Sequence, residues 1–391
     1  MCDGLNLATA GSGMRRVLLT TGGTGGHVFP ALAVAEVLNE RGVSCLFVGS
    51  DYGREAEWVR EAGLDFTGLP VRGVLDRGFR AVGALGGMAL AVFKANKILR
   101  EFKPDVVAGF GSYASCAALT AAWMRDVPVL IHEQNSFPGL TNRLMGRIAK
   151  RICLSMPTSS GEGAESFFPH GKCVWTGNPV RKAFLEAMLH ATPSPEANHT
   201  PRLLVVGGSL GSKALNSLIL AGLTRLAEAG VDVLHQTGKQ DYERVEAGYR
   251  AYGMPADRVV PFISDMPAAY AWADLVLCRA GASTVAELAV CGKPAVFIPF
   301  PHATHDHQAY NARLVCHDGA AMMFTEKELA KKDALGAILM LLRDKDQLTL
   351  MSRAARDLSR IDAAESVARE IMKLFGGTND ALRSGEESQV G

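Results

Sequence analysis

The feature that most constrains the fold is a pattern that occurs twice: a short apolar segment, a glycine-rich loop and then a helix pattern. The first copy starts at residue 16 (RVLLTT, then TGGTGGHVFP), and the second starts at residue 202 (RLLVVGG, then SLGSKALN). Short apolar runs bounded by glycine are typical of buried strands, and strands that alternate with helices favour a parallel sheet. The alternation stops near Gly177-Asn178-Pro179 and resumes after the polar segment 190–201. The sequence therefore predicts two α/β domains, each with a doubly wound parallel sheet.

The same pattern predicts the bounds of the domains and their elements. We expect a first domain at 14–180 and a second at 181–358, with a C-terminal helix at about 360–375 that packs back on the first. The strands expected in the first domain are 16–21, 44–49, 66–69, 105–109 and 129–132. Those expected in the second are 202–208, 232–238, 258–262, 274–281 and 294–300. Helices are expected at 31–41, 54–62 and 342–375.

The composition of the 391 residues limits the classes of function. With 48% apolar and 21% charged residues the chain is globular, and a net charge of +1 argues against general nucleic-acid binding. The eight cysteines form no CxxC pair, which indicates reduced thiols of a cytosolic protein. The first 13 residues do not resemble a signal peptide, and no apolar run reaches the ~20 residues of a membrane span. We therefore expect the protein to remain on the cytoplasmic side.

The stretch 275–292 (LVLCRAGASTVAELAVCG) combines several features of a ligand site. A buried strand leads into a helix whose first turn, Ala282-Ser283-Thr284, has small side chains. Backbone N–H groups at the positive end of a helix dipole bind phosphate or diphosphate. Glu287 follows about one turn later, where it can bind sugar hydroxyls, and Arg279 supplies positive charge. This combination predicts a nucleotide-sugar site, and the alternative is an ordinary capped helix of an α/β unit.

The two glycine loops exclude other classes of nucleotide enzyme. In the first loop, the position that the dinucleotide fingerprint G-x-G-x-x-G requires as its third glycine, counted from Gly23, is Val28. In the second loop, Gly211 is followed by Ser212-Lys213 and not by the Lys-Ser/Thr of a phosphate-binding P-loop. A nicotinamide oxidoreductase and an NTPase therefore fit the sequence poorly.

Seven motifs, in order and spacing, closely resemble one family, and the similarity covers about residues 14–375. These motifs are TGGTGGHVFPALAVA, FGSYAS, HEQNSFPGLTNR, TGNPVR, GGSLGSKALN, CRAGASTVAELAVCGKPAVFIPF and HQAYNA. The family is MurG, the N-acetylglucosamine transferases of peptidoglycan synthesis. The resemblance implies the GT-B architecture, with two Rossmann-like domains that face a cleft.

What this resemblance implies for function is specific. N-acetylglucosamine would pass from UDP-N-acetylglucosamine to the C4 hydroxyl of the N-acetylmuramyl sugar of lipid I. The product would be lipid II, with inversion at the anomeric carbon and with neither a metal nor a cofactor. The protein would act as a peripheral protein at the cytoplasmic face of the bacterial plasma membrane, beside anionic lipid and other wall-synthesis and division proteins.

The resemblance also implies a set of donor-site residues. Glu287 would hold the ribose, Gln308 the transferred sugar, and Ile263 would lie beside the uracil. Many relatives carry Gln-Gln where this chain has His307-Gln308, which leaves the role of the first of these positions open. The complete expected set is Thr24, Gly25, Gly26, Asn135, Arg181, Ser209, Ile263, Ala282, Ser283, Thr284, Val285, Ala286, Glu287 and Gln308.

Transfer with inversion also needs a base for the acceptor hydroxyl. His27, at the end of the first glycine loop, is one candidate, because an unperturbed histidine titrates near neutral pH. Its alternative role is to hydrogen-bond the loop or the acceptor's phosphates. Glu133 is the rival base, and its alternative role is to anchor neighbouring loops. Tyr113 is either an acceptor-orienting residue or a core ring.

The segment 302–307 (HATHDH) resembles a metal cluster, but neighbours in an irregular loop cannot all converge on one ion. Solvated loop residues, with one or two that face the sugar, are the better interpretation.

An apolar stretch at 81–93 is flanked by cations and predicts contact with a membrane surface. Thirteen residues are too few to cross a bilayer, but an apolar face rimmed by basic residues suits docking on anionic lipid. The alternative is a helix half-buried against the sheet, and both can hold on different faces. The expected patch consists of Arg77, Phe79, Arg80, Leu85, Met88, Leu90, Phe93, Lys94 and Lys97, with Trp123 and Arg125 as an extension.

Three competing functions remain open at this point. One is a glycosyltransferase with another lipid acceptor, such as diacylglycerol. The second is a UDP-N-acetylglucosamine 2-epimerase, which shares the double fold and needs no lipid. The third is a non-catalytic membrane scaffold, in which loss of His27 or Glu287 would still support growth.

Overall fold

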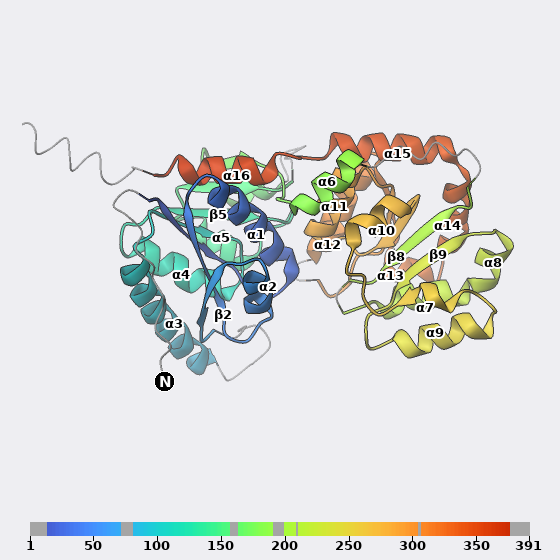
Figure 1. Ribbon diagram of the computed structural model, residues 1–391, viewed down its shortest axis with the longest axis horizontal. Coiled ribbons are helices and arrows are strands. Elements are labelled where there is room, and N and C mark those ends of the chain that lie inside the picture. Colours follow the sequence, from blue (N-terminus) through green and yellow to red (C-terminus); the bar gives the residue numbers. More distant parts are fainter. Residues whose placement is uncertain are drawn as a thin grey trace, which may run out of the picture. The chain divides into compact units, whose positions relative to one another are not determined.

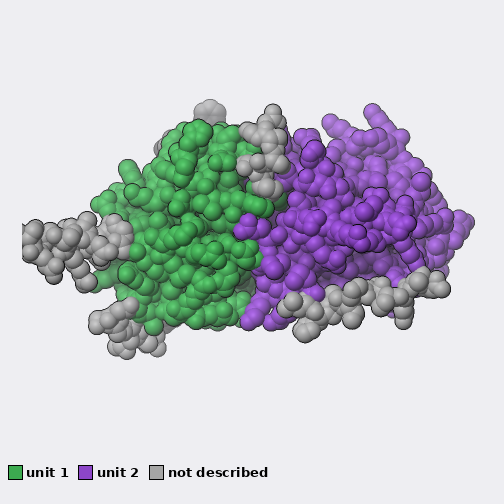
Figure 2. All heavy atoms as spheres, turned by 90° about the horizontal axis from the view of Figure 1, so that it is seen from above, with its two compact units in different colours: residues 1–134, 138–179, 362–391 green, residues 135–137, 180–361 purple. Residues whose placement is uncertain are grey.

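The computed structural model describes residues 14–71, 81–156, 163–190, 199–208, 210–303 and 306–375, without the side chains of 81–85 and 189–190. The chain divides into two compact units, coloured separately in Figure 2. Unit 1 contains residues 1–134, 138–179 and 362–391. Unit 2 contains residues 135–137 and 180–361. Each unit is built around its own parallel sheet, which confirms the predicted fold class.

Unit 1 has a seven-stranded sheet in the order β3-β2-β1-β4-β5-β6-β7, and every pair of neighbouring strands is parallel. The strands are β1 Arg16–Thr20, β2 Ser44–Ser50, β3 Asp65–Leu69, β4 Val106–Gly109, β5 Val129–Glu133, β6 Arg151–Leu154 and β7 Cys173–Trp175. The helices are α1 Gly25–Glu40, α2 Glu55–Glu61, α3 Ala81–Phe102, α4 Tyr113–Trp123, α5 Leu140–Met145 and α16 Ala363–Met372.

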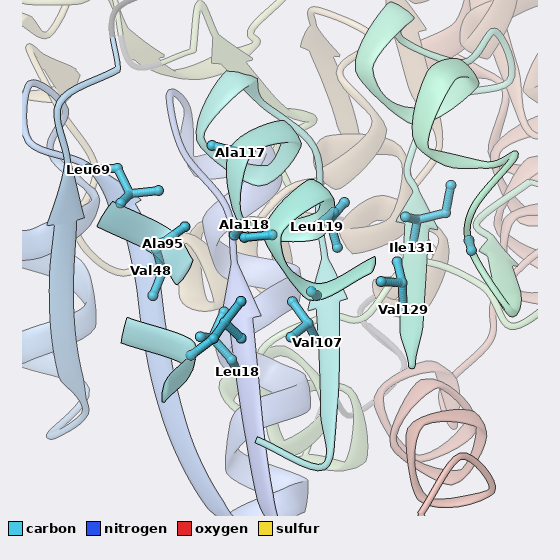
Figure 3. Close-up of a cluster of buried hydrophobic side chains, with 14 of the residues drawn as sticks. Leu18, Val48, Leu69, Ala95, Val107, Ala117, Ala118, Leu119, Val129 and Ile131 are labelled. Carbon is cyan, nitrogen blue, oxygen red and sulfur yellow. The ribbon is translucent and has the colours of Figure 1, made fainter. Parts of the chain in front are cut away.

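Side chains on the two faces of this sheet form two separate cores, because successive residues of a strand point to opposite faces. Leu18 packs with Ala95 of α3 and Leu119 of α4 on one face (Figure 3). Its neighbour Leu19 packs on the other face with residues of α1 and with Val367 of α16. Burial on both faces explains why the strands are continuous apolar runs.

Unit 2 has a six-stranded parallel sheet in the order β10-β9-β8-β11-β12-β13. Its neighbouring strands β8 and β9 are labelled in Figure 1. Its strands are β8 Arg202–Val206, β9 Asp232–Gln236, β10 Val259–Val260, β11 Leu275–Cys278, β12 Ala295–Phe297 and β13 Ala321–Met323. Its helices are α6 Lys182–His190, α7 Lys213–Ala221, α8 Leu223–Glu228, α9 Tyr242–Ala251, α10 Met266–Trp272, α11 Ala282–Cys291, α12 His307–His317, α13 Glu326–Leu329, α14 Ala334–Arg343 and α15 Lys345–Asp357.

The expected start of the first helix was wrong. Helix α1 begins at Gly25 and not at residue 31, so the glycines and His27 form its first turn. Glycine and Pro30 disfavour a helix by propensity, but the burial of Val28 and Val34 against the sheet outweighs that cost. The C-terminal stretch 342–375 is mostly helical, as expected, and contains two helices: Asp344 caps α15, and a break at residues 358–362 precedes α16.

Helix α16 belongs to unit 1 and lies beside α1 (Figure 1). Arg41 forms an ion pair with Glu365, and Arg151 Nε lies 3.0 Å from Glu370 Oε2. Val367 and Ile371 are fully buried among residues of α1 and β1. The chain therefore returns to its first unit only in its last described helix. None of the helices within the described ranges is both long and apolar enough to cross a membrane.

Candidate functional site

The clearest candidate site in unit 2 lies where β11 leads into α11. Gly281 precedes the helix in an extended conformation, and Val285 N donates to Gly281 O at 2.9 Å. The N–H groups of a first helical turn have no partner inside the helix, and the dipole makes this end positive. The side chains of the turn, Ser283 and Thr284, are small and partly exposed. The structure thus has a helix start at the position where the sequence predicts an anion site.

One turn along the same helix, Glu287 lies in an environment that raises the pKa of its carboxyl group. Tyr270 Oη donates to Glu287 Oε2 at 3.4 Å, and Arg181 Nη2 lies 4.0 Å from Oε1. Burial raises the pKa of Glu287 from its ordinary 4.5 to about 7, although Arg181 and Tyr270 act in the opposite direction. A ligand that donates hydroxyl hydrogen bonds would favour the ionised carboxylate, so the residue is suited to bind a diol.

Arg279 has a different role from the one we expected. Its Nη1 donates to the carbonyls of Ile298 and Pro299 at 2.8 and 3.1 Å, and its Nη2 lies 2.6 Å from Glu326 Oε1. Its side chain is only 14% exposed. The guanidinium thus satisfies backbone carbonyls and a carboxylate, and its charge is not available as a separate diphosphate contact. Arg279 stabilises the loop after β12.

Two loops of unit 2 are joined by a glutamine that sequence reasoning did not single out. Gln236 is buried at the end of β9, and its Nε2 donates to Gly208 O at 3.0 Å and to Pro261 O at 3.2 Å. These carbonyls belong to the second glycine loop and to the loop that carries Ile263. A polar side chain at the carboxyl end of a parallel strand lies where ligands of such sheets bind, and that signal could have identified it.

A second residue missed from the sequence, Asn311 of α12, is fully buried. Its Nδ2 donates to Asn135 Oδ1 and to Ala280 O, both at 3.2 Å, and its Oδ1 accepts from Ser136 N at 3.0 Å. Asn311 thereby fixes the segment 135–137 within unit 2, next to the start of α11. On the same helix, Gln308 Oε1 accepts from Phe300 N at 3.0 Å.

In unit 1 the candidate site is the first turn of α1. His27 N donates to Thr24 O at 3.0 Å, and His27 Nδ1 lies 3.1 Å from Gln134 Oε1. Gly111 has φ +94°, and a Cβ there would lie 3.0 Å from His27 Nδ1. Glycine at this position therefore lets the loop after β4 approach the imidazole closely.

The rival base, Glu133, is 1% exposed and holds a loop. Its Oε2 accepts from Asn142 Nδ2 at 2.9 Å and from Gly139 N at 3.1 Å. These contacts correspond to the anchoring role that we considered for it. Tyr113, the first residue of α4, is partly buried against the core of unit 1.

The expected residues are divided between the two units. Thr24, Gly25, Gly26, His27, Tyr113 and Glu133 belong to unit 1. Asn135, Arg181, Ile263, the six residues 282–287 and Gln308 belong to unit 2. Ser209 lies outside the described residues. Within the described ranges, no three His, Cys, Asp or Glu side chains are grouped as a metal site, and His305 of the segment 302–307 is not described.

The surface of α3 and the end of α4 carries exposed apolar side chains. Leu90, Phe93, Trp123 and Met124 are 58%, 67%, 56% and 61% exposed. Arg125 Nη1 donates to Asn96 Oδ1 at 3.0 Å, which joins the end of α4 to α3.

The opposite side of α3 is buried in the core, as expected for a helix half-buried against the sheet. Met88 is partly buried against that core, while Lys94 and Lys97 lie near Asp51 and Glu101. Arg77, Phe79 and Arg80 lie outside the described residues, as does the side chain of Leu85.

Comparisons with known proteins agree with this architecture. The glycosyltransferase family 28 N-terminal domain model matches residues 17–154, and the C-terminal domain model of that family matches residues 202–371. A UDP-N-acetylglucosamine 2-epimerase structure has a TM-score of 0.63 at 14% identity, over 93% of this chain and 97% of its own, and shows the fold alone.

Three more similar proteins carry one family name. The chain is 50% identical over 367 residues (93% of this chain, 99% of the relative) to the UDP-N-acetylglucosamine–N-acetylmuramyl-(pentapeptide) pyrophosphoryl-undecaprenol N-acetylglucosamine transferase of Nitratidesulfovibrio vulgaris Hildenborough. It is 49% identical over 361 residues (92% and 98%) to the Lawsonia intracellularis transferase of the same name. The crystal structure of Acinetobacter baumannii MurG matches at 34% identity with a TM-score of 0.74, over 92% of this chain and 99% of that one. The chain therefore belongs to the MurG family of N-acetylglucosamine transferases.

Proposed function

We propose that this protein transfers N-acetylglucosamine from UDP-N-acetylglucosamine to the C4 hydroxyl of the N-acetylmuramyl sugar of lipid I, which yields lipid II. The observation that carries this proposal is the site on α11. A helix N-terminus suited to a diphosphate and a largely buried carboxylate suited to a diol lie one turn apart. Relatives of nearly the same length are named for this reaction.

The donor would be held mainly by unit 2. The first turn of α11 would bind the diphosphate, and Glu287 the ribose hydroxyls. Gln236 would keep the loop of Ile263 in place beside the uracil, and Gln308 would bind the transferred sugar. Thr24, Gly25 and Gly26 at the start of α1, with Asn135, Arg181 and Ser209, would complete the donor set.

The reaction is a single displacement. The acceptor's C4 oxygen forms a bond to the anomeric carbon, the bond from that carbon to the diphosphate oxygen breaks, and UDP leaves with the bonding electron pair. Attack from the face opposite the leaving group inverts the anomeric centre. His27 takes the hydroxyl proton, and the N–H groups of α11 stabilise the charge that develops on the diphosphate. Because N–H groups serve this purpose, the reaction does not need a metal ion.

The test is transfer of radiolabelled sugar from UDP-N-acetylglucosamine to a short-chain lipid I analogue by the purified full chain. We expect equal rates with and without EDTA, no product with diacylglycerol as acceptor, and no epimerised UDP-sugar when the acceptor is omitted. Loss of activity in EDTA would contradict the metal-free mechanism. Transfer only to diacylglycerol, or epimerisation alone, would establish one of the competing functions instead.

The exposed residues of α3 and α4 fit a peripheral attachment to the cytoplasmic face of the membrane, where a lipid-borne acceptor lies. Apolar side chains surrounded by cations bind anionic lipid through burial and charge together. Leu90, Phe93, Trp123 and Met124 would enter the interface, and Lys97 and Arg125 would remain at its level. Membership in the MurG family is the basis on which we also propose other wall-synthesis and division proteins as partners.

Replacing Phe93 with glutamate is expected to weaken binding to phosphatidylglycerol vesicles at least about tenfold. Burying one phenylalanine side chain contributes roughly 1.5–3 kcal/mol, and the new charge would also repel the lipid. Vesicle co-sedimentation measures the effect. Transfer to a short-chain acceptor in solution should remain within about twofold of wild type.

Tyr252→Glu is the matched control, because Tyr252 is an exposed aromatic residue (60%) in unit 2. Equal vesicle binding by Phe93→Glu and Tyr252→Glu would refute the membrane role of α3.

A further inference from the structure

We propose that Gln134, a residue with no assigned role, fixes the proton of the His27 imidazole on Nδ1 and leaves the lone pair on Nε2. The kinetic consequence of this inference rests on the proposed role of His27 as base. The position of the proton is independent of that role, because it follows from hydrogen bonds within unit 1 alone.

The orientation of the Gln134 amide is fixed by its surroundings. Gln134 is 1% exposed, and its Nε2 lies 3.0 Å from Phe110 O, a backbone carbonyl that can only accept a hydrogen bond. The reverse orientation would place two carbonyl oxygens against each other. Nε2 is therefore the atom next to Phe110 O, and Oε1 is the atom 3.1 Å from His27 Nδ1.

An amide oxygen accepts and cannot donate, so His27 Nδ1 must carry a proton. In a neutral imidazole the proton on one nitrogen leaves the other with a lone pair. Gly111 Cα lies against the same edge of the ring without a side chain to compete for Nδ1. Nε2 is thereby the nitrogen of His27 that can take a proton from a hydroxyl.

His132 also fixes the orientation of the Gln134 amide, through a hydrogen bond to Gln134 Nε2. Gln134 Nε2 also lies 3.2 Å from His132 Nδ1, which must accept, and His132 Nε2 lies 3.1 Å from Gly177 O, to which it donates. Burial lowers the pKa of His132 to about 4, so the ring is neutral at working pH and remains able to accept. His27 and His132 therefore carry their protons on opposite nitrogens, with Gln134 between them.

The experiment is nitrogen NMR of the full, ligand-free chain labelled with ¹⁵N-histidine at pH 8. We expect the Nδ1–H form for His27, assigned by its loss in His27→Ala, and the Nε2–H form for His132. His235 is a reference within the same spectrum. Its Nε2 donates to Asn216 Oδ1 at 3.0 Å, because Asn216 Nδ2 already donates to Asp241, so His235 should also be Nε2–H. A His27 signal of the Nε2–H form in wild type would overturn the inference without any variant.

Gln134→Leu removes the acceptor and should release the proton from Nδ1. We expect kcat to fall about 10²-fold, as for a base in the wrong tautomer, while KM for UDP-N-acetylglucosamine stays within about twofold. Gln134→Glu can preserve the acceptor for His27 only if its other carboxyl oxygen is protonated, because that oxygen faces Phe110 O, and in that form it should retain Nδ1–H. If the leucine variant does not fold, the wild-type spectrum alone tests the position of the proton. Gln347→Leu, on an exposed turn of α15, is the matched control and should change neither readout.

The outcomes separate this inference from the proposed function. An unchanged His27 tautomer in Gln134→Leu would refute the positioning role of Gln134. A changed tautomer with unchanged kcat would support the positioning role and would contradict His27 as the base.

Discussion

His27→Ala is expected to lower kcat for transfer to a lipid I analogue by about 10³-fold, with KM for UDP-N-acetylglucosamine within about twofold of wild type. A positioned general base contributes about 10²- to 10⁴-fold to rate, and the donor contacts of unit 2 do not involve His27. Steady-state kinetics with the donor varied at saturating acceptor measures the two constants separately.

His170→Ala, an exposed histidine of the same unit, is the control and should behave as wild type. Glu133→Gln provides the comparison with the rival base. Glu133 already accepts from Asn142 and Gly139, so its replacement should mainly lower the free energy of unfolding and change kcat only a few-fold. A loss of about 10³-fold in kcat for a folded Glu133→Gln, with His27→Ala active, would reverse the two assignments.

Glu287→Ala is expected to raise the Kd of UDP-N-acetylglucosamine by about 10²-fold, because two charge-assisted hydrogen bonds to the ribose would be lost. Glu287→Gln retains one hydrogen-bond acceptor and should raise this Kd about tenfold. Calorimetry in the absence of the lipid acceptor measures the Kd of both variants. An affinity for the donor that is unchanged in Glu287→Ala would refute the ribose role.

The pH dependence of donor binding follows from the same residue. Burial raises the pKa of Glu287 to about 7 in the ligand-free protein, and hydrogen bonds from the ribose would favour the ionised form. Binding below pH 7 must therefore release a proton. The Kd of UDP-N-acetylglucosamine should rise about tenfold from pH 8 to pH 6, and the rise should be absent in Glu287→Gln. The donor's diphosphate diester does not titrate in this range, so it does not confuse the measurement.

The raised pKa of Glu287 should also make the free energy of unfolding of the ligand-free protein depend on pH. The pKa of Glu287 is higher in the folded protein than its ordinary 4.5, so between pH 4.5 and about 7 the folded state binds more protons than the unfolded state. Stability therefore falls as pH rises through this window. Glu287→Gln should raise the free energy of unfolding by on the order of 2 kcal/mol at pH 8 and by less than about 1 kcal/mol at pH 5. Equal gains at both pH values would contradict the burial of a titrating carboxylate.

The family and the fold class could be predicted from the sequence because both depend on local patterns. The double strand, glycine and helix pattern predicted two parallel sheets, and seven short motifs predicted the MurG family. The start of α1 was wrong because glycine and proline disfavour helices by propensity, while the burial of Val28 and Val34 depends on the sheet. Three strands were missed, β6, β7 and β13, each of three or four residues. Length alone is not the reason, because β12 also has three residues and was predicted. β7 and β13 are edge strands with partly exposed residues, and the apolar pattern of such strands is weaker.

The sequence by itself determined the residue types at the carboxyl ends of the strands, because that information is local. Only the tertiary structure decided the hydrogen-bond partners and the burial of these residues. His27 and Gln134 are 107 positions apart and Asn311 and Asn135 are 176 apart, so no periodicity could pair them. The state of the charged groups could not be predicted from local patterns either. Arg279 forms an ion pair with Glu326, which is 47 positions away, and the pKa of Glu287 is raised because distant segments bury its carboxyl group. Hydrogen-bond partners and desolvation arise from contacts between remote segments, and these exist only once the chain has folded.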